Sequence, residues 1–299
     1  MRNILPFVKV TFQCRWEEQP LQPMSPLVWR DRIEWQFKKI ACITIRRRCD
    51  ECSVRKGCIV SFLFTPSFWF EGKLPSASGS IPLPWVPSYP DTVSEKNFTL
   101  AVTLIGEKAI SVLPYWFVAI DRLGKTNRQR FELVSVMSDT GSGQRILYEA
   151  EHGTFFTDPG ISEPRTFAGA LKLRLDILTP LKILSAKKPL LTPSFKSILQ
   201  SIKSRCVMLG SFYGEGEIKF DYDPTALESV STEMLNVHWH EQHLFSKKQK
   251  ETISLSGLTG SLVFEGDLEP FGLLLGMGEY LGIGKGTALG LGRYELQAV

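Results

Sequence analysis

The chain has 299 residues, of which 43% are hydrophobic and 22% are charged. This composition excludes a chain that is disordered throughout, and the length favours two domains of roughly 100 to 200 residues each. The net charge of +4 is too small to indicate a nucleic-acid partner by itself, so that class of partner must be argued from local clusters.

The first half of the chain begins with a predicted strand at residues 4–13 and a predicted helix at residues 27–40. Residues 65–97 are rich in Pro, Ser and Gly, which predicts a long irregular excursion. The apolar run at residues 109–120 is shorter than the roughly 20 residues that a membrane span needs, and it contains Pro114. We therefore expect a buried helix there.

The first 14 residues lack a basic head followed by a long apolar core and a small-residue cleavage site. Nothing in them marks the chain for secretion. We expect a cytoplasmic protein that does not associate with a membrane.

Residues 153–166 hold two prolines and little periodicity, which makes them the expected boundary between domains at 1–160 and 161–299. The second domain is predicted to contain a strand at 171–183 and a helix at 194–209.

A hairpin is predicted at residues 252–265, with Gly257 and Gly260 bracketing its turn. Together with the strand and helix before it and the strand that ends the chain, this hairpin completes the order β, α, β, β, α, β. That order is the ferredoxin-like pattern.

Residues 103–136 and 263–299 read as two copies of one unit, made of a strand, a helix, a glycine loop and a second strand. The closing strands are RFELVSV, from Arg130, and RYELQAV, from Arg293, with four of seven positions identical. Duplication of a whole domain is the simpler explanation, and chance similarity is the alternative. The predicted fold class is α+β, with two tandem ferredoxin-like (RRM-like) domains.

The stretch from Gly276 to Tyr294, GMGEYLGIGKGTALGLGRY, resembles the glycine-rich signature of the CRISPR repeat-processing endoribonucleases of the RAMP superfamily. Three further stretches look like the same family: residues 264–271, residues 178–182, and residues 103–106 with 113–115. The resemblance implies a prokaryotic protein that binds CRISPR repeat RNA and cuts the precursor transcript into guide RNAs. It also implies association with other Cas proteins of an effector complex.

The glycine loop suits an RNA backbone, because glycines let the main chain approach a phosphate and point N–H groups at it, and Lys285 adds a positive charge. The alternative is a structural turn between the last helix and the last strand. The spacing does not fit a phosphate-binding Walker loop. The candidate RNA-binding residues of this loop are Gly282, Gly284, Lys285, Gly286, Gly290 and Gly292.

Positive charge gathers between residues 30 and 48, where seven basic residues stand against two acidic ones. A second cluster lies beside the predicted hairpin, although lysines on a loop are often only solvated. The candidate phosphate contacts in these clusters are Arg30, Arg32, Arg46, Arg47, Lys247 and Lys248.

Cys42, Cys49, Cys52 and Cys58 are closely spaced, in the pattern C-x2-C-x5-C preceded by one more thiol. In a cytosolic chain this spacing indicates a metal site more than a disulfide, and a structural zinc would hold a loop with little core of its own. Reduced cysteines without a ligand and an iron–sulfur cluster are the alternatives.

The family resemblance implies cleavage by a ribose 2′-hydroxyl, leaving a 2′,3′-cyclic phosphate without any metal or other cofactor for catalysis. Members of the family commonly place a histidine near the first helix, whereas no histidine precedes His152 here. His238 and His240 are therefore the first catalytic candidates, since histidine titrates near neutral pH. Lys38 and Lys39 are the second, acting by charge. A non-catalytic RAMP subunit that grips guide RNA is the rival function.

Overall fold

The computed structural model describes residues 5–45, 48–71, 81–90, 95–126, 128–216, 218–220, 222–246 and 250–299. The chain divides into two compact units. Unit 1 comprises Met1–Glu163 with Leu209–Gly216, and unit 2 comprises Pro164–Met208 with Glu217–Val299. The end of one helix, at Leu209–Gly216, is grouped with unit 1. Each unit is therefore built from two separate segments of the chain.

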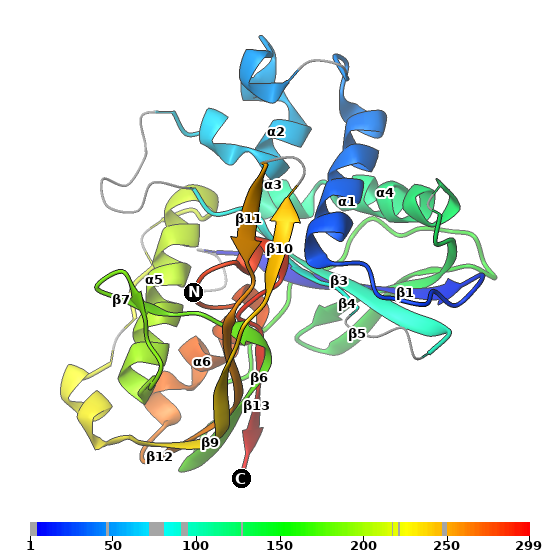
Figure 1. Cartoon of the computed structure of the whole chain (residues 1–299). Coiled ribbons are helices and arrows are strands. Elements are labelled where there is room, and N and C mark those ends of the chain that lie inside the picture. The colour runs from blue at the N-terminus through cyan, green and yellow to red at the C-terminus, as the bar shows by residue number, and fades with distance from the viewer. Residues whose placement is uncertain are drawn as a thin grey trace. The chain divides into compact units, whose positions relative to one another are not determined.

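Unit 1 contains a five-stranded antiparallel sheet with strand order β2-β3-β1-β4-β5 (Figure 1). The first four positions follow the ferredoxin-like order, and β5 adds an edge strand. The elements are β1 (Phe7–Trp16), α1 (Pro26–Ala41), α2 (Ile59–Phe64), β2 (Trp85–Ser88), β3 (Asn97–Ile105), α3 (Glu107–Ile110), α4 (Leu113–Thr126), β4 (Phe131–Thr140) and β5 (Gly143–Glu149).

Helix α1 begins where the sequence allows it, because the Ser25 hydroxyl accepts a hydrogen bond from the Val28 N–H at 3.4 Å and Pro26 occupies the first turn. Trp29, Ile33 and Phe37 recur at helical spacing and are all buried. They form the core face of α1. The opposite face carries the exposed Trp35 and Lys39.

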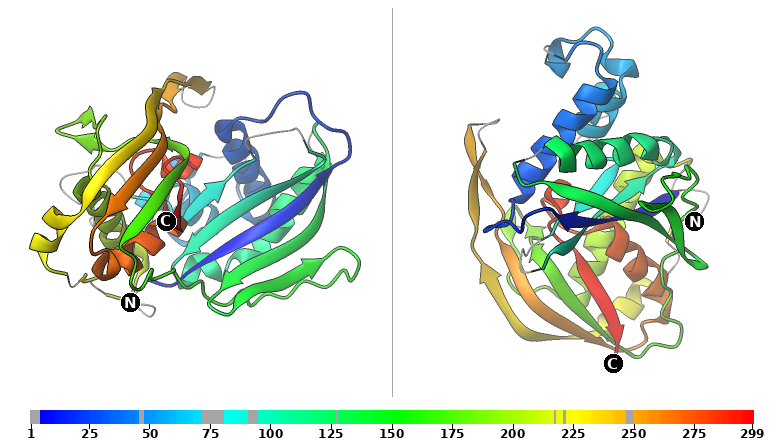
Figure 2. Two further views of the ribbon diagram at one scale, coloured as in Figure 1. Left: turned by 90° about the horizontal axis from the view of Figure 1, so that it is seen from below. Right: turned by 90° about the vertical axis from the view of Figure 1, so that its right-hand side faces the viewer.

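Unit 2 repeats the arrangement, with strand order β13-β6-β12-β9 and helices α5 and α6 on one side of the sheet (Figure 2). Its elements are β6 (Lys172–Leu181), β7 (Leu184–Ser185), β8 (Lys188–Pro189), α5 (Phe195–Tyr213), β9 (Ser231–His240), β10 (His243–Ser246), β11 (Glu251–Ser254), β12 (Gly257–Glu265), α6 (Gly272–Leu281) and β13 (Tyr294–Ala298). No helix among the described residues is both long and apolar enough to cross a bilayer.

The predicted duplication is confirmed, since β3-α4-β4 and β12-α6-β13 occupy equivalent places in the two sheets. Gly106 and Gly266 each follow the first of these strands with a positive φ, of 84° and 148°. A side chain at either position would be strained, so the two glycines share one structural cause. The α+β class with two ferredoxin-like domains is confirmed as well.

The predicted hairpin turn at Gly257–Gly260 is wrong. Gly257 begins β12, and Gly260, with φ of 112°, lies where the pairing of β12 with β9 shifts its register. A glycine inside a strand can mark a bulge as readily as a turn. The arm instead consists of β9 and β12, which pair antiparallel, extended by the antiparallel pair of β10 and β11 (Figure 1).

A strand was missed inside the excursion predicted for residues 65–97. β2 pairs with β3 although Pro87 lies within it. A proline removes one donor from the sheet, and this loss is tolerated because β2 is an edge strand. Trp85 anchors it, with a fully buried ring whose Nε1–H donates to the Leu63 carbonyl at 2.8 Å.

Candidate functional site

The histidine candidates lie at one end of the unit 2 sheet. Leu258 of β12 stands opposite Leu181 of β6 on one side and Trp239 of β9 on the other. The same register pairs His238 with Thr259 and His240 with Gly257. Both histidines are exposed and alternate along β9, so they project from one face of this strand.

His238 is held by two hydrogen bonds. Its Nδ1 lies 3.0 Å from the Asn236 carbonyl oxygen, and its Nε2 lies 3.0 Å from the Thr259 hydroxyl. Because a carbonyl oxygen can only accept, Nδ1 carries the proton. The Nε2 atom faces the Thr259 hydroxyl. The His240 ring makes no hydrogen bond within the part of the chain that the structure describes.

Lys182, immediately after β6, contacts both Trp239 of β9 and the glycine loop. Its Nζ lies 5.9 Å from the centre of the Trp239 ring, and its carbonyl oxygen accepts a hydrogen bond from the Lys285 N–H at 2.9 Å. Lys182 was not among the residues predicted to form a site. The 178–182 stretch in the family resemblance was the signal that pointed to it.

The glycine loop is shaped by the protein's own packing. A Cβ on Gly284 would lie 2.5 Å from the Lys182 carbonyl oxygen, and one on Gly292 would lie 1.8 Å from the Ile283 carbonyl oxygen. Gly282, Gly284, Gly286, Gly290 and Gly292 all have φ between 65° and 84°. The glycines are therefore needed for close contacts inside unit 2, and phosphate contact by them stays a prediction. Lys285 is exposed.

In unit 1, Lys38 of α1 is half-buried and forms an ion pair with Glu34, with Nζ 3.1 Å from the carboxylate oxygen. Burial alone would lower the pKa of Lys38, but the Glu34 carboxylate outweighs this effect and raises that pKa. Lys38 is thus a fixed positive charge and a poor proton acceptor. Lys39 is exposed and lies beside Trp35, with Nζ 5.5 Å from its ring centre.

Arg30 and Arg32 are half-buried in the first turns of α1. Burial lowers the pKa of Arg32, and the nearby Arg128 cation, which follows α4, lowers it further. Two neighbouring guanidinium groups favour an anion, and Arg128 was not predicted as part of the cluster. Four predicted contacts lie outside the described residues: Arg46, Arg47, Lys247 and Lys248.

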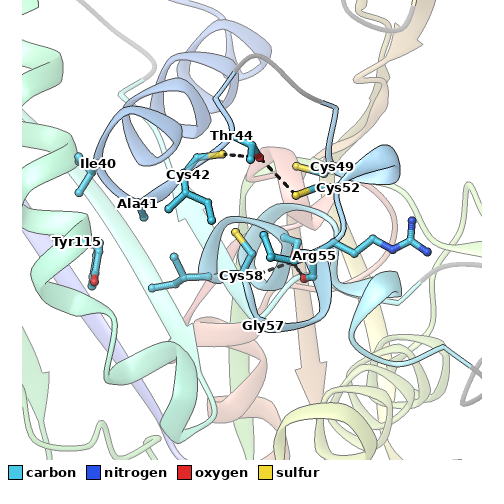
Figure 3. A pocket seen from close by; sticks show the side chains of 14 residues that line it. Ile40, Ala41, Cys42, Thr44, Cys49, Cys52, Arg55, Gly57, Cys58 and Tyr115 are labelled. Atoms are coloured by element: carbon cyan, nitrogen blue, oxygen red, sulfur yellow. Dashed lines mark hydrogen bonds between the residues drawn. The ribbon is translucent and has the colours of Figure 1, made fainter.

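The four clustered cysteines surround a hollow at the end of α1 (Figure 3). Cys42 caps α1, Cys49 begins a 3₁₀ turn, Cys52 ends it, and Cys58 precedes α2. As the described side chains stand, no three Cys, His, Asp or Glu residues are close enough to hold a common ion. The metal site therefore stays a prediction.

Two protein families match the chain, one over each half. Residues 175–294 match the family described as CRISPR-associated endoribonuclease Cas6, and residues 5–159 match the N-terminal domain family AF_1859_N. The first match spans β6, the histidine strand β9 and the glycine loop. No curated protein sequence shows a significant match to the chain.

Solved structures of similar proteins cover nearly the whole chain. A Cas6 protein of Thermus thermophilus matches at TM-score 0.55 and 14% identity, covering 98% of this chain and 99% of its own. A Cas6 product complex matches at TM-score 0.53 and 16% identity, with 97% and 99% covered. A RAMP protein that binds different RNA substrates matches at TM-score 0.50 and 13% identity, with the same coverage. At these identities the likeness shows a shared fold.

Proposed function

Because this chain belongs to the CRISPR-associated repeat-processing endoribonuclease family, we propose that it binds CRISPR repeat RNA and cleaves the precursor transcript into guide RNAs. Like the product complex formed by its relative, it would remain on the cut repeat. From there it would pass the guide RNA to the other Cas proteins of an effector complex.

The observation that carries this proposal is the grouping at the end of the unit 2 sheet. His238 and His240 project from one face of β9, and Trp239, with the Lys182 ammonium over its indole ring, lies between them in sequence and projects from the other face. Imidazoles can move protons near neutral pH, ammonium groups contact phosphates, and an indole can stack on an unpaired base. These are the groups that RNA cleavage by an internal nucleophile requires.

The proposed reaction uses the RNA's own 2′-hydroxyl as the nucleophile. One histidine accepts the proton of this hydroxyl while its oxygen attacks the adjacent phosphorus, and the bond from phosphorus to the 5′-oxygen breaks. The second histidine, protonated, donates a proton to the departing 5′-oxygen. The products are a 2′,3′-cyclic phosphate and a 5′-hydroxyl, and no bound metal takes part.

The first prediction tests this reaction directly. Purified protein should cleave its own repeat RNA in the presence of EDTA and leave a 2′,3′-cyclic phosphate end, mapped by mass spectrometry. A matched RNA with a 2′-deoxyribose at the cut position should bind equally well and stay intact, because it lacks the nucleophile. Cleavage of the deoxy RNA would refute the internal attack, and loss of cleavage in EDTA alone would refute metal independence.

A non-catalytic RAMP subunit that binds guide RNA is the second candidate function. One observation favours it: the sequence has no histidine before His152, and so none in helix α1. Under this alternative the protein binds repeat RNA tightly and the intact ribose substrate gives no product at all.

The second prediction concerns Lys38 as a fixed charge. If Lys38 and Lys39 act by charge in place of the histidines, Lys38→Ala should lower the cleavage rate by about 10²-fold, which is typical for loss of one group that stabilises charge in a transition state. Lys38→Arg should retain most of the rate, because the Glu34 partner already holds Lys38 in its protonated form and arginine supplies the same charge.

Lys196→Ala is the matched control, since Lys196 pairs with Glu228 at 2.6 Å on the surface of α5. Its cleavage rate should equal that of the unmodified protein. Thermal unfolding of all three variants separates lost charge from lost folding. If Lys38→Arg is as inactive as Lys38→Ala in folded protein, Lys38 takes part in proton transfer and the fixed-charge role is wrong.

A further inference from the structure

The segment between Cys42 and Cys58 lacks a hydrophobic core of its own. Neither of its two short 3₁₀ turns contains a buried residue. Ile43 is 82% and Val54 42% exposed, although both line the same hollow as the thiols. The four thiols are half-buried. Burial of apolar groups therefore contributes little to holding this segment in place.

The four thiols face one hollow from four separate points of the chain (Figure 3). The Sγ atoms of Cys42 and Cys52 lie 4.0 Å and 3.4 Å from the same Thr44 hydroxyl oxygen. Cys49 and Cys52 lie at the two ends of a single 3₁₀ turn, with the Cys52 N–H donating to the Cys49 carbonyl at 3.4 Å. The four thiols therefore line one hollow, although no three of them are yet close enough to share an ion.

We propose that Cys42, Cys49, Cys52 and Cys58 bind one zinc ion as thiolates, at a site that the RNA-processing function does not use. Zinc in structural sites takes four tetrahedral ligands, with sulfur atoms about 2.3 Å from the ion. The thiols must close inward to reach this geometry, displacing the Thr44 hydroxyl from between two of them. Each thiol loses its proton on binding.

The surroundings suit an anionic metal centre. One zinc ion with four thiolates carries two net negative charges. The Arg55 side chain lines the hollow, and the Lys38 ammonium interacts electrostatically with Cys42 and Cys49. These cations partly offset the charge of the centre, so that its burial costs less.

The ion would brace the end of α1. Cys42 directly follows this helix, and Cys58 directly precedes α2. The two helices already meet through Phe37 and Phe64, whose ring centres are 5.5 Å apart. A zinc ion would close the connection between them.

The third prediction measures the metal. Full-length protein purified without chelators should contain one zinc ion per chain by mass spectrometry of the metal. Exchange with Co²⁺ should give a thiolate-to-cobalt charge-transfer band and the visible bands of a tetrahedral ion. Serine at any of the four positions should reduce bound zinc to background and abolish these bands. Cys206→Ala, at a buried thiol outside the cluster, should keep one zinc per chain.

A second measurement on the unmodified protein covers the case in which the serine variants fail to fold. Burial raises the pKa of Cys206 to about 12 and raises that of Cys14 further, so both thiols should resist alkylation in the native state. The four clustered thiols should be protected while zinc is bound and should all react after a strong chelator removes it. Mass spectrometry of the labelled peptides distinguishes the two groups.

Three results would overturn the proposal. Protein that contains no zinc and takes up none on titration excludes the site. Acid-labile sulfide and iron in the purified protein indicate an iron–sulfur cluster instead. If the labelling shows that the same thiols are paired as disulfides and no metal is bound, disulfide bonds and not zinc hold the segment together. None of these results bears on RNA cleavage, which is assayed separately.

Discussion

Replacing both His238 and His240 with alanine should lower the rate of RNA cleavage by about 10²- to 10⁴-fold, the usual contribution of positioned general acids and bases. Both histidines lie on one face of β9, at the end of the unit 2 sheet. Their side chains are exposed and fill no core position, so the double variant should fold normally. The measurement is a single-turnover cleavage assay on the ribose substrate.

RNA binding should change much less than cleavage in this variant. Affinity comes mainly from cationic contacts with phosphates. The uncleavable 2′-deoxy RNA allows affinity to be measured in the same buffer. A loss of binding as large as the loss of cleavage would show that the histidines hold the RNA and do not act on its protons.

His243→Ala is the matched control. His243 is exposed on β10, in the same arm, with its Nε2 3.1 Å from a Glu241 carboxylate oxygen. It shares the residue type and the surroundings but lies beyond the end of β9, so cleavage should stay within a few-fold of the unmodified rate. Full activity in the His238→Ala/His240→Ala protein would remove both residues from the mechanism and leave Lys38 and Lys39 as the candidates.

The single variants should differ from one another. The Nε2 of His238 is engaged by the Thr259 hydroxyl, whereas the His240 ring has no hydrogen bond with any described residue. A ring nitrogen that is already hydrogen-bonded within the protein is less available to an RNA hydroxyl, so His240 is the better candidate for the base. We expect His240→Ala to be the more damaging of the two.

The sequence was sufficient to predict the fold, because the same strand, helix and strand pattern occurs in both halves of the chain. The matching strands that begin near Arg130 and Arg293 lie at equivalent positions of the two sheets, as β4 and β13. The hydrophobic spacing of Trp29, Ile33 and Phe37 fixed the first helix to within one residue at either end. Periodicity works well where one face of an element is fully buried.

Prediction failed where one residue type has two structural uses. Glycine ends strands and also makes bulges, so Gly260 indicated a turn although it lies inside a long strand pair. Proline breaks strands in the middle of a sheet but is tolerated at its edge, so β2 was hidden by Pro87. Only the pairing partner decides between the two uses, and that partner is distant in the sequence.

The candidate site was harder to predict, because its members are brought together by register. Lys182 lies far from Trp239 in the sequence, and the two meet because β12 pairs with both β6 and β9. No spacing rule within one segment contains that information. The cysteine cluster is the opposite case, since its four members are close in sequence and line one hollow, while the metal that their spacing predicted stays a prediction.

Gly292→Ala should destabilise unit 2 by about 4 kcal/mol or more, which is at the upper end for single substitutions. Two costs add together. An alanine at φ of 70° is strained by roughly 1–2 kcal/mol, and its Cβ would lie 1.8 Å from the Ile283 carbonyl oxygen. That contact is with backbone, which cannot rotate away. The Ile283 N–H also donates to the Gly292 carbonyl at 2.9 Å. Moving residue 283 or residue 292 to relieve the contact would break this bond.

Gly169→Ala isolates the first cost, because Gly169 lies in the same unit with φ of 68° and nothing within 4 Å of the added Cβ. The midpoint of urea unfolding, followed by circular dichroism, should fall slightly for Gly169→Ala and much further for Gly292→Ala. Equal midpoints would show that the loop relaxes freely around residue 292. Packing within the protein would then not require glycine at these positions. Contact with the RNA backbone would become the stronger explanation for them.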